Sequence, residues 1–232
     1  MTGETAPAAR MRGDGEALVE RIASSGYAFL PRHDGDADAA KVAAALGEPI
    51  VPWKGTLVQQ LVPRAISTPN TYSGIFGLGR FPFHTDLAHW RRPPRYLMLR
   101  CVKGFVEVPT LLLDGWAVVD AVKRDIMGRA VVRPRRPQSG AMRLLRLWQE
   151  HGDEGDLIRW DDVFLKPASR IGELAFGKVR EHLESVVSTP LAMVETGDTL
   201  IIDNWRMLHS RPPMSPGCED RRLERVYLGR LN

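Results

Sequence analysis

The feature that most constrains the fold is a series of short apolar runs in the later part of the chain. Runs such as RYLMLRC (95–101), TLIIDN (199–204) and RRLERVYLGRL (221–231) are rich in aliphatic residues, and stretches rich in Gly, Pro, Asp and Ser separate them. Helices usually need about ten or more periodic residues, whereas short apolar runs bounded by turn residues are typical of strands. These runs therefore predict many short β-strands.

Helical periodicity marks fewer segments. An acidic start and a closing glycine predict a helix over about 15–25, and a second helix is expected to begin at Asp36 or Asp38. Asp114 is placed to cap a helix over DGWAVVDAVKRDIM, and the longest helix is expected over about 168–187. Helices in front of and between many short strands predict an α+β fold whose core is a sandwich or a small barrel.

The length of 232 residues predicts one domain over residues 15–232, behind a flexible lead-in over residues 1–14. That lead-in lacks the apolar segment of a secretory signal, and no run reaches the roughly 18 apolar residues of a membrane span. Cys101 and Cys218 lie far apart, which favours two reduced thiols in a cytoplasmic protein over a disulfide.

The net charge of +4 comes from arginine clusters such as residues 133–136. These clusters lie between apolar runs rather than along one helix face, and the sequence has no zinc knuckle or helix-turn-helix signature. A basic balance can indicate nucleic acid binding. Here we expect a small-molecule partner with an anionic group instead, and neither nucleic acid nor membrane.

A histidine and an acidic residue lie two residues apart at three places: His84/Asp86, His151/Asp153 and His182/Glu184. A chain with six histidines and 28 acidic residues contains such pairs readily by chance. The third pair lies on an expected helix, where residues two apart point in different directions. The second lies in the hydrophilic turn HGDEGD. Only His84 and Asp86 follow an extended apolar stretch, FPF, where alternate side chains share one face.

A third ligand for that pair is His209, which follows TLIIDNWRML and is expected at the end of a buried strand. Strands far apart in sequence become neighbours in a rolled sheet, so His209 can approach the pair. Two histidines and one carboxylate form the facial triad of non-haem Fe(II) enzymes. The alternative for His209 is a buried histidine that hydrogen-bonds a backbone carbonyl.

Two arginines on the last apolar run, over residues 221–231, support the interpretation of His209 as a metal ligand. Arg221 and Arg225 lie four apart and therefore share a strand face. A buried guanidinium needs an anionic partner and binds a carboxylate in bidentate fashion. A keto-acid cosubstrate has this requirement, because one end chelates the metal while the distal carboxylate meets an arginine.

The ordered segments FPFHTDLAHW (81–90), PTLLLDGWAVVDAV (109–122), GDTLIIDNWRMLHSR (197–211) and DRRLERVYL (220–228) resemble one known family. They are similar to the TauD/TfdA (taurine dioxygenase-like) Fe(II)/2-oxoglutarate-dependent dioxygenases, and in particular to the clavaminate synthase-like branch. The resemblance covers about residues 65–232. It implies a double-stranded β-helix, a jelly-roll core with flanking helices.

The resemblance also assigns roles to individual residues. It implies that His84, Asp86 and His209 bind Fe(II), and that Arg221 binds the distal carboxylate of 2-oxoglutarate. Further positions matching the family are Thr110 as a hydrogen-bond partner of the cosubstrate, Arg225 for an anionic group of the substrate, and Asn70, Tyr72 and Ser73 as lining of the substrate pocket. The loop that holds the last three can also be a glycine-rich connector.

The implied reaction uses O2 and 2-oxoglutarate, yields succinate and CO2, and hydroxylates an amino acid or a small natural-product intermediate. The carboxylate of Asp86 favours hydroxylation over halogenation, while desaturation and cyclisation stay open. The alternatives are a metal-binding jelly roll without turnover, a metallohydrolase and a nucleic-acid-directed dioxygenase. Only 122 residues separate Asp86 from His209, so we expect the segment that covers the active site in this family to be short. A large substrate, or a partner chain such as a second copy, would then close the pocket.

Overall fold

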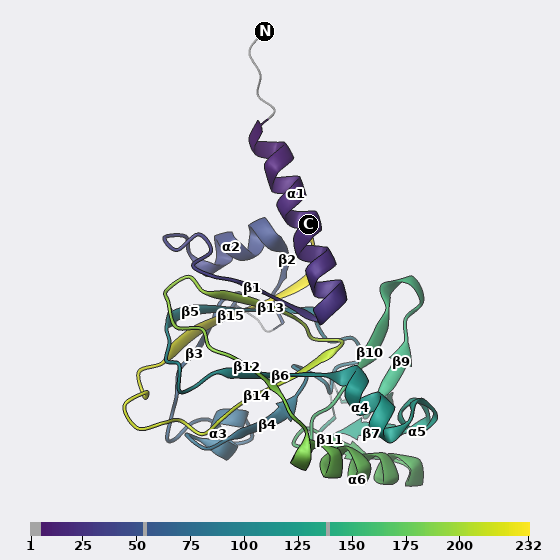
Figure 1. Cartoon of the computed structure of the whole chain (residues 1–232). Coiled ribbons are helices and arrows are strands. Elements are labelled where there is room, and N and C mark those ends of the chain that lie inside the picture. Colours follow the sequence, from purple (N-terminus) through teal and green to yellow (C-terminus); the bar gives the residue numbers. More distant parts are fainter. Residues whose placement is uncertain (1–5, 53–54, 138–139) are drawn as a thin grey trace.

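The computed structural model describes residues 6–52, 55–137 and 140–232. Two antiparallel sheets are stacked at its centre, with helices outside them (Figure 1). The first sheet has the strand order β1-β13-β5-β15-β2, and β3 also pairs with β15. Its strands are β1 (Tyr27–Leu30), β2 (Gly47–Ile50), β3 (Gln59–Leu61), β5 (Tyr96–Lys103), β13 (Thr199–Asp203) and β15 (Arg222–Leu231).

The second sheet has the order β12-β6-β14-β4, so strands that lie far apart in the sequence are neighbours in it. Its strands are β4 (Phe81–His84), β6 (Thr110–Asp114), β12 (Thr189–Leu191) and β14 (Met207–Arg211). Two smaller sheets lie beside it and contain β7 (Val131–Pro134), β8 (Leu145–Arg146), β9 (Trp148–Glu150), β10 (Asp156–Ile158) and β11 (Leu165–Pro167). A single turn of 3₁₀-helix spans Gly152–Glu154.

Alternation along the strands divides the apolar residues between two layers. On β5, Leu97 and Leu99 face the space between the sheets, where they join residues such as Leu112 of the second sheet. Met98 points the other way and packs under α1 (Ala6–Ser25) and α2 (Ala39–Leu46). Because successive strand side chains point to opposite faces, one buried strand contributes to both layers.

A third apolar cluster covers the outer face of the second sheet. The helices α4 (Gly115–Val122), α5 (Arg124–Arg129) and α6 (Arg170–Ser185) pack there against residues such as Phe83 and Leu208. Two of these helices begin at a residue whose side chain caps the helix N-terminus. Asp114 accepts a hydrogen bond from the backbone N–H of Trp116 at 3.0 Å, and Ser169 accepts one from Gly172 at 3.0 Å.

The structure corrects four local expectations. A short helix, α3 (Tyr72–Phe76), lies where a loop is expected. Thr71 caps it, but five residues are too few to carry a periodic signal. The helix expected over DGWAVVDAVKRDIM is divided into α4 and α5 at Lys123, whose φ is 90°. The helix expected from about residue 15 begins at Ala6, and residues 1–5 of the expected lead-in lie outside the described residues.

The fourth correction concerns the position of His209, which lies inside its own strand, β14, rather than at the end of the preceding one. The chain turns between Asp203 and Met207, so the apolar stretch forms two strands that belong to different sheets. Cys101 and Cys218 are both buried free thiols. Among the described helices, none combines the length and the apolar character needed to cross a membrane.

Candidate metal centre

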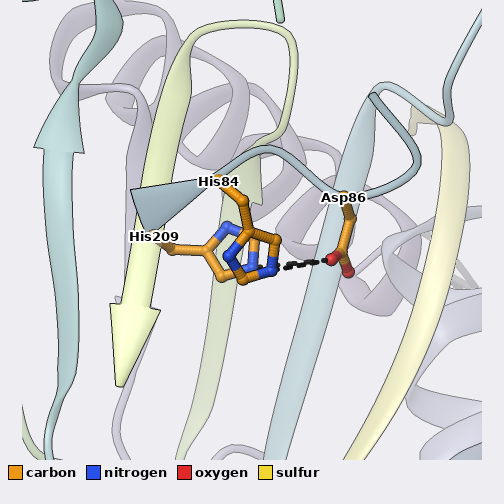
Figure 2. Close-up of side chains that lie close together, drawn as sticks. All are labelled: His84, Asp86 and His209. Atoms are coloured by element: carbon orange, nitrogen blue, oxygen red, sulfur yellow. Dashed lines mark ion pairs between the residues drawn. The ribbon is translucent and has the colours of Figure 1, made fainter. Parts of the chain in front are cut away.

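His84, Asp86 and His209 come together between the two sheets (Figure 2). The strands β4 and β14 are antiparallel neighbours, and their register places His84 directly opposite His209. The Nε2 atom of His84 lies 3.3 Å from Oδ1 of Asp86, and the Nε2 atom of His209 lies 3.7 Å from the same oxygen. One ligand atom from each residue therefore lies within 4.8 Å of the others, and all three side chains are buried.

The two imidazoles present Nε2 to the centre of this group. The Nδ1 atom of His84 lies 2.9 Å from the backbone carbonyl oxygen of Pro82, so an Nδ1–H donor leaves the Nε2 lone pair free. Such a hydrogen bond is the usual way in which a protein orients a metal-binding histidine. Burial, and then the neighbouring His84, lowers the pKa of His209 to about 3, which keeps that ring neutral as a metal ligand must be.

Asp86 is held from several sides. Its backbone N–H donates to Oδ1 of Asn204 at 2.6 Å, and the Asn204 amide donates back to the carbonyl of Asp86 at 2.9 Å. Its second carboxylate oxygen, Oδ2, accepts from Arg225 at 2.9 Å and from the hydroxyl of Tyr227 at 2.8 Å. Burial opposes ionisation, but the charge of Arg225 and the hydrogen bond with His84 hold the pKa of Asp86 well below its usual value. Asp86 is therefore an ionised, fixed carboxylate with Oδ1 directed at the two histidines.

A cavity of about 340 Å³ adjoins the three residues and extends to Arg221. Thr110, Arg225 and Ser73 also line it, so seven of the nine residues selected from the sequence meet in one place. Arg221 is 7% exposed, and its Nε atom has no hydrogen-bond partner among the described residues. Burial and the nearby charge of Arg211 lower the pKa of Arg221 to about 10. A buried guanidinium with an unused donor is suited to an incoming carboxylate.

Arg211 also lines this cavity, although no sequence motif indicated it. It lies two residues after His209 on the same strand, so strand alternation could have placed it on the same face. Its guanidinium donates to the backbone carbonyls of Gly77 and Gly79, at 3.2 and 2.5 Å. Arg211 thereby fixes the loop before β4 and adds positive charge to the cavity.

A second cavity, of about 410 Å³, also adjoins His84 and Asp86. Asn70 and Tyr72 line this second cavity rather than the first, so the three selected loop residues are divided between the two cavities. The Tyr72 ring stacks on His84 with a centroid separation of 4.3 Å. Asp161 also lines it, and no sequence motif indicated this residue.

The other two His-x-acid pairs form no such group in the described part of the chain. His151 and Asp153 lie at the 3₁₀ turn, where the carboxylate of Asp153 is exposed. His182 and Glu184 lie on α6. The geometry thus selects the pair that the strand pattern favoured.

Comparison with known proteins extends this picture. No family model matches the sequence. Clavaminate synthase 2 from Streptomyces clavuligerus is 29% identical over 160 residues, which cover 63% of this chain and 49% of that protein. Gamma-butyrobetaine dioxygenase from Homo sapiens is 25% identical over 174 residues, which cover 64% of this chain and 44% of that protein. The chain thus spans about half the length of these curated relatives.

Solved structures share the fold more completely. Asparagine oxygenase in complex with Fe(II), 3-hydroxyasparagine and succinate aligns with a TM-score of 0.70 at 19% identity, covering 96% of this chain and 79% of that one. The non-heme iron oxygenase OrfP in complex with Fe and alpha-ketoglutaric acid aligns with a TM-score of 0.68 at 21% identity, covering 93% and 79%.

The fold is therefore the mixed helix and antiparallel-sheet fold that these non-haem iron oxygenases share. Within that fold, this chain holds a buried His-Asp-His group that could bind a metal ion. The curated sequence relatives indicate which group of oxygenases this chain is similar to. Clavaminate synthase 2 and gamma-butyrobetaine dioxygenase support a similarity of this chain to the TauD/TfdA-like Fe(II)/2-oxoglutarate oxygenases, which is the family that the ordered sequence segments resemble.

Proposed function

We propose that this protein is an Fe(II)/2-oxoglutarate-dependent oxygenase that hydroxylates an amino acid or a small natural-product intermediate. The observation that carries the proposal is the cavity that joins the buried His-Asp-His group to the buried guanidinium of Arg221. The similarity to clavaminate synthase 2 and to the structure of asparagine oxygenase supports the same activity. We further propose that the two stacked sheets form a double-stranded β-helix of the jelly-roll type.

The donor set fits a divalent iron ion. Two neutral imidazole nitrogens and one ionised carboxylate oxygen form the 2-His-1-carboxylate triad, which leaves further coordination positions for other ligands. In this assignment His84, Asp86 and His209 hold the metal, and Arg225 with Tyr227 fixes the orientation of Asp86. When bound, the iron supplies the oxygen chemistry in which 2-oxoglutarate becomes succinate and CO2 and the substrate is hydroxylated.

The cosubstrate site lies in the first cavity. Arg221 binds the distal carboxylate of 2-oxoglutarate, since it is buried and forms no ion pair with a described acid. Thr110 is 5% exposed and lines the same cavity, where its hydroxyl can donate to the same carboxylate. Apolar side chains such as Leu97 and Leu99 line the walls and exclude water from the space between the metal ligands and Arg221.

Asp86 also bears on the type of reaction. Its carboxylate occupies the place at which a halide would have to enter, so hydroxylation is favoured over halogenation. Desaturation and cyclisation are other outcomes of the same chemistry. We also propose a cytoplasmic location, which is supported by the two buried free thiols.

The decisive experiment measures O2 uptake and succinate formation by the purified protein with Fe(II), 2-oxoglutarate and a panel of amino acids. We expect succinate, and a product heavier by one oxygen atom for at least one member of the panel. The His209→Ala variant is the matched control that removes one ligand. A wild-type protein that binds neither Fe(II) nor 2-oxoglutarate in calorimetry would disprove the proposal.

A further inference from the structure

A smaller cavity, of about 180 Å³, adjoins the second cavity, and the proposed metal and cosubstrate chemistry does not use it. This third cavity shares Asn70, His89 and Phe164 with the second, and residues 134–137 form the rest of its wall. Ligand cavities usually measure about 300–1,000 Å³, so the third cavity has room for one group rather than for a whole ligand. A molecule in the second cavity, beside the metal ligands, can place such a group there.

The wall of the third cavity is positively charged. Arg135 and Arg136 line it, and none of its described lining residues is acidic. Neither arginine forms an ion pair with a described acid, whereas Arg129 pairs with Asp125 at 3.1 Å. The side chain of Arg135 makes one long hydrogen bond, of 3.3 Å, to the neutral Oδ1 of Asn70. The charges of the two guanidinium groups are therefore uncompensated.

The two arginines belong to the most basic stretch of the chain. Residues 133–146 include five arginines and no acidic residue. These five positive charges exceed the net charge of +4, so the remainder of the chain is slightly negative. A concentration of one charge sign at a cavity attracts ligands of the opposite sign. The sequence analysis predicted an anionic small-molecule partner from these clusters, and the metal centre gives residues 133–146 no role.

The backbone holds the arginine pair in place. Pro134 ends β7, where it pairs with Leu165 of β11 (Figure 1). The backbone N–H of Arg135 donates to the carbonyl oxygen of Phe164 at 2.7 Å. Proline also follows the pair, at Pro137, and the ring of each flanking proline fixes its own φ. Because the arginines extend from the edge of a small sheet, little backbone freedom is lost when a ligand binds.

Two further groups supply N–H donors to the same cavity. The Nδ1 atom of His89 is buried and has no hydrogen-bond partner among the described residues. Asn70 directs its Oδ1 to Arg135, and its side-chain NH₂ donates to no described residue. The backbone of Asn70 has a φ of 62°, in the left-handed region that non-glycine residues adopt at an energetic cost. The cavity thus combines positive charge with unused N–H donors, which is the requirement of an oxyanion.

We propose that the third cavity binds a phosphate group at one end of an extended substrate, whose reacting end lies in the second cavity beside the metal ligands. This inference rests on the proposed function and deepens it, since it assigns a phosphate monoester to the substrate. A phosphate monoester carries a charge of about −1.5 to −2 at neutral pH, which the two guanidinium groups match. Arginine also binds phosphate oxygens in bidentate fashion. A carboxylate would leave one of the two positive charges uncompensated.

The test uses calorimetry on protein loaded with Mn(II) and saturating 2-oxoglutarate, so that Arg221 is occupied and no turnover takes place. The probes are pairs of increasing length that differ in one phosphate. They are O-phospho-L-serine against L-serine, O-phospho-L-tyrosine against L-tyrosine, and phosphopantetheine against pantetheine. L-glutamate against L-glutamine tests a carboxylate in the same way. We expect at least one phosphorylated probe to bind about 10- to 100-fold more tightly than its parent.

The double variant Arg135→Gln/Arg136→Gln removes the charge of the third cavity. We expect it to lose the preference for the phosphorylated probe. The matched control is Arg143→Gln/Arg146→Gln, which removes the same charge from the same basic stretch but changes no residue that lines the cavity. We expect this control to keep the preference.

Four results overturn the inference: no preference in any phosphate pair, a preference that survives in Arg135→Gln/Arg136→Gln, an equal loss in both double variants, or a preference for L-glutamate alone. The third of these would mean general attraction to the basic stretch rather than a site. Affinities for Mn(II) and 2-oxoglutarate are measured in the same samples. If both bind to the wild type and only the phosphate preference is absent, the inference fails alone. If neither binds to the wild type, the proposed function fails.

Discussion

Arg225 donates a hydrogen bond of 2.9 Å to Oδ2 of Asp86, from a strand that lies 139 positions away in sequence. Oε1 of Gln59 accepts two further hydrogen bonds from the same guanidinium, so Asp86 on one side and Gln59 on the other hold the Arg225 side chain in place. The arrangement leaves Oδ1 of Asp86 for the histidines. The substrate contact expected of Arg225 stays a prediction. Its hydrogen bond to Asp86 supports a further role in orienting that carboxylate.

We expect the change Arg225→Gln to weaken binding of Fe(II) or Mn(II) by about 10- to 100-fold, since residues that orient a metal ligand contribute this much. Tyr227→Phe removes the other donor to Oδ2 and should have a smaller effect in the same direction. Metal titration by calorimetry measures both. The matched control is Arg230→Gln, which removes an exposed arginine of the same strand that pairs with Glu48. Unchanged metal affinity in Arg225→Gln, with a raised KM for substrate, would return Arg225 to the substrate role alone.

The change Asp86→Ala should remove metal binding and succinate formation together. The reason is that it deletes the only carboxylate of the triad, and we expect the metal affinity to fall by at least about 100-fold. Equilibrium dialysis with Mn(II) gives the affinity, and mass spectrometry gives the succinate. Asp153→Ala serves as the control, because it changes another His-x-Asp pair on an exposed turn. Full succinate production by Asp86→Ala would show that the triad is assigned wrongly.

The change Arg221→Ala should chiefly raise the apparent KM for 2-oxoglutarate, by about 10- to 100-fold, because a charged bidentate contact is lost. Metal affinity without cosubstrate should stay close to the wild-type value. Arg222→Ala is the matched control on the adjacent, exposed position of the same chain segment. If the KM for 2-oxoglutarate stays unchanged in Arg221→Ala, the contact must come from Arg211 or Arg225 instead.

The change Asp161→Asn should increase stability at neutral pH in the absence of substrate. Burial raises the pKa of Asp161 above 3.8, so the folded state disfavours its charged form. The resulting penalty is absent below pH 3.8, grows as the pH rises from there through the folded-state pKa, and is constant above it. The difference in melting temperature between variant and wild type should therefore be positive at pH 7 and shrink toward zero as the pH falls toward 4. A variant that is less stable than the wild type at pH 7 would contradict this account.

Much of this protein follows from local sequence. The short apolar run RYLMLRC predicts β5, and the alternation in RRLERVYLGRL predicts β15, since strand faces repeat every two residues. Asp114 and the periodic run over 170–185 likewise indicate helices correctly. The sequence also distinguishes His84/Asp86 from the two other His-x-acid pairs, because extended chain places side chains two residues apart on one face.

Other features could not be read from any local pattern. Pairing of β4 with β14 places His84 opposite His209, and it depends on closure of a sheet over a long stretch of chain. The bond from Arg225 to Asp86 and the division of the loop over 70–73 between two cavities depend on how the two sheets stack.

The sequence by itself determined the strands, most of the helices and the residue types of the metal site, because strand alternation and helix caps are properties of neighbouring residues. Only the tertiary structure decided which of those residues share a cavity. Asp161 shows the difference most clearly, since its neighbours in sequence predict a turn, while its burial without a cation beside Tyr72 exists only in the folded protein. Burial and charge compensation are properties of the packed chain, so no local sequence pattern shows them.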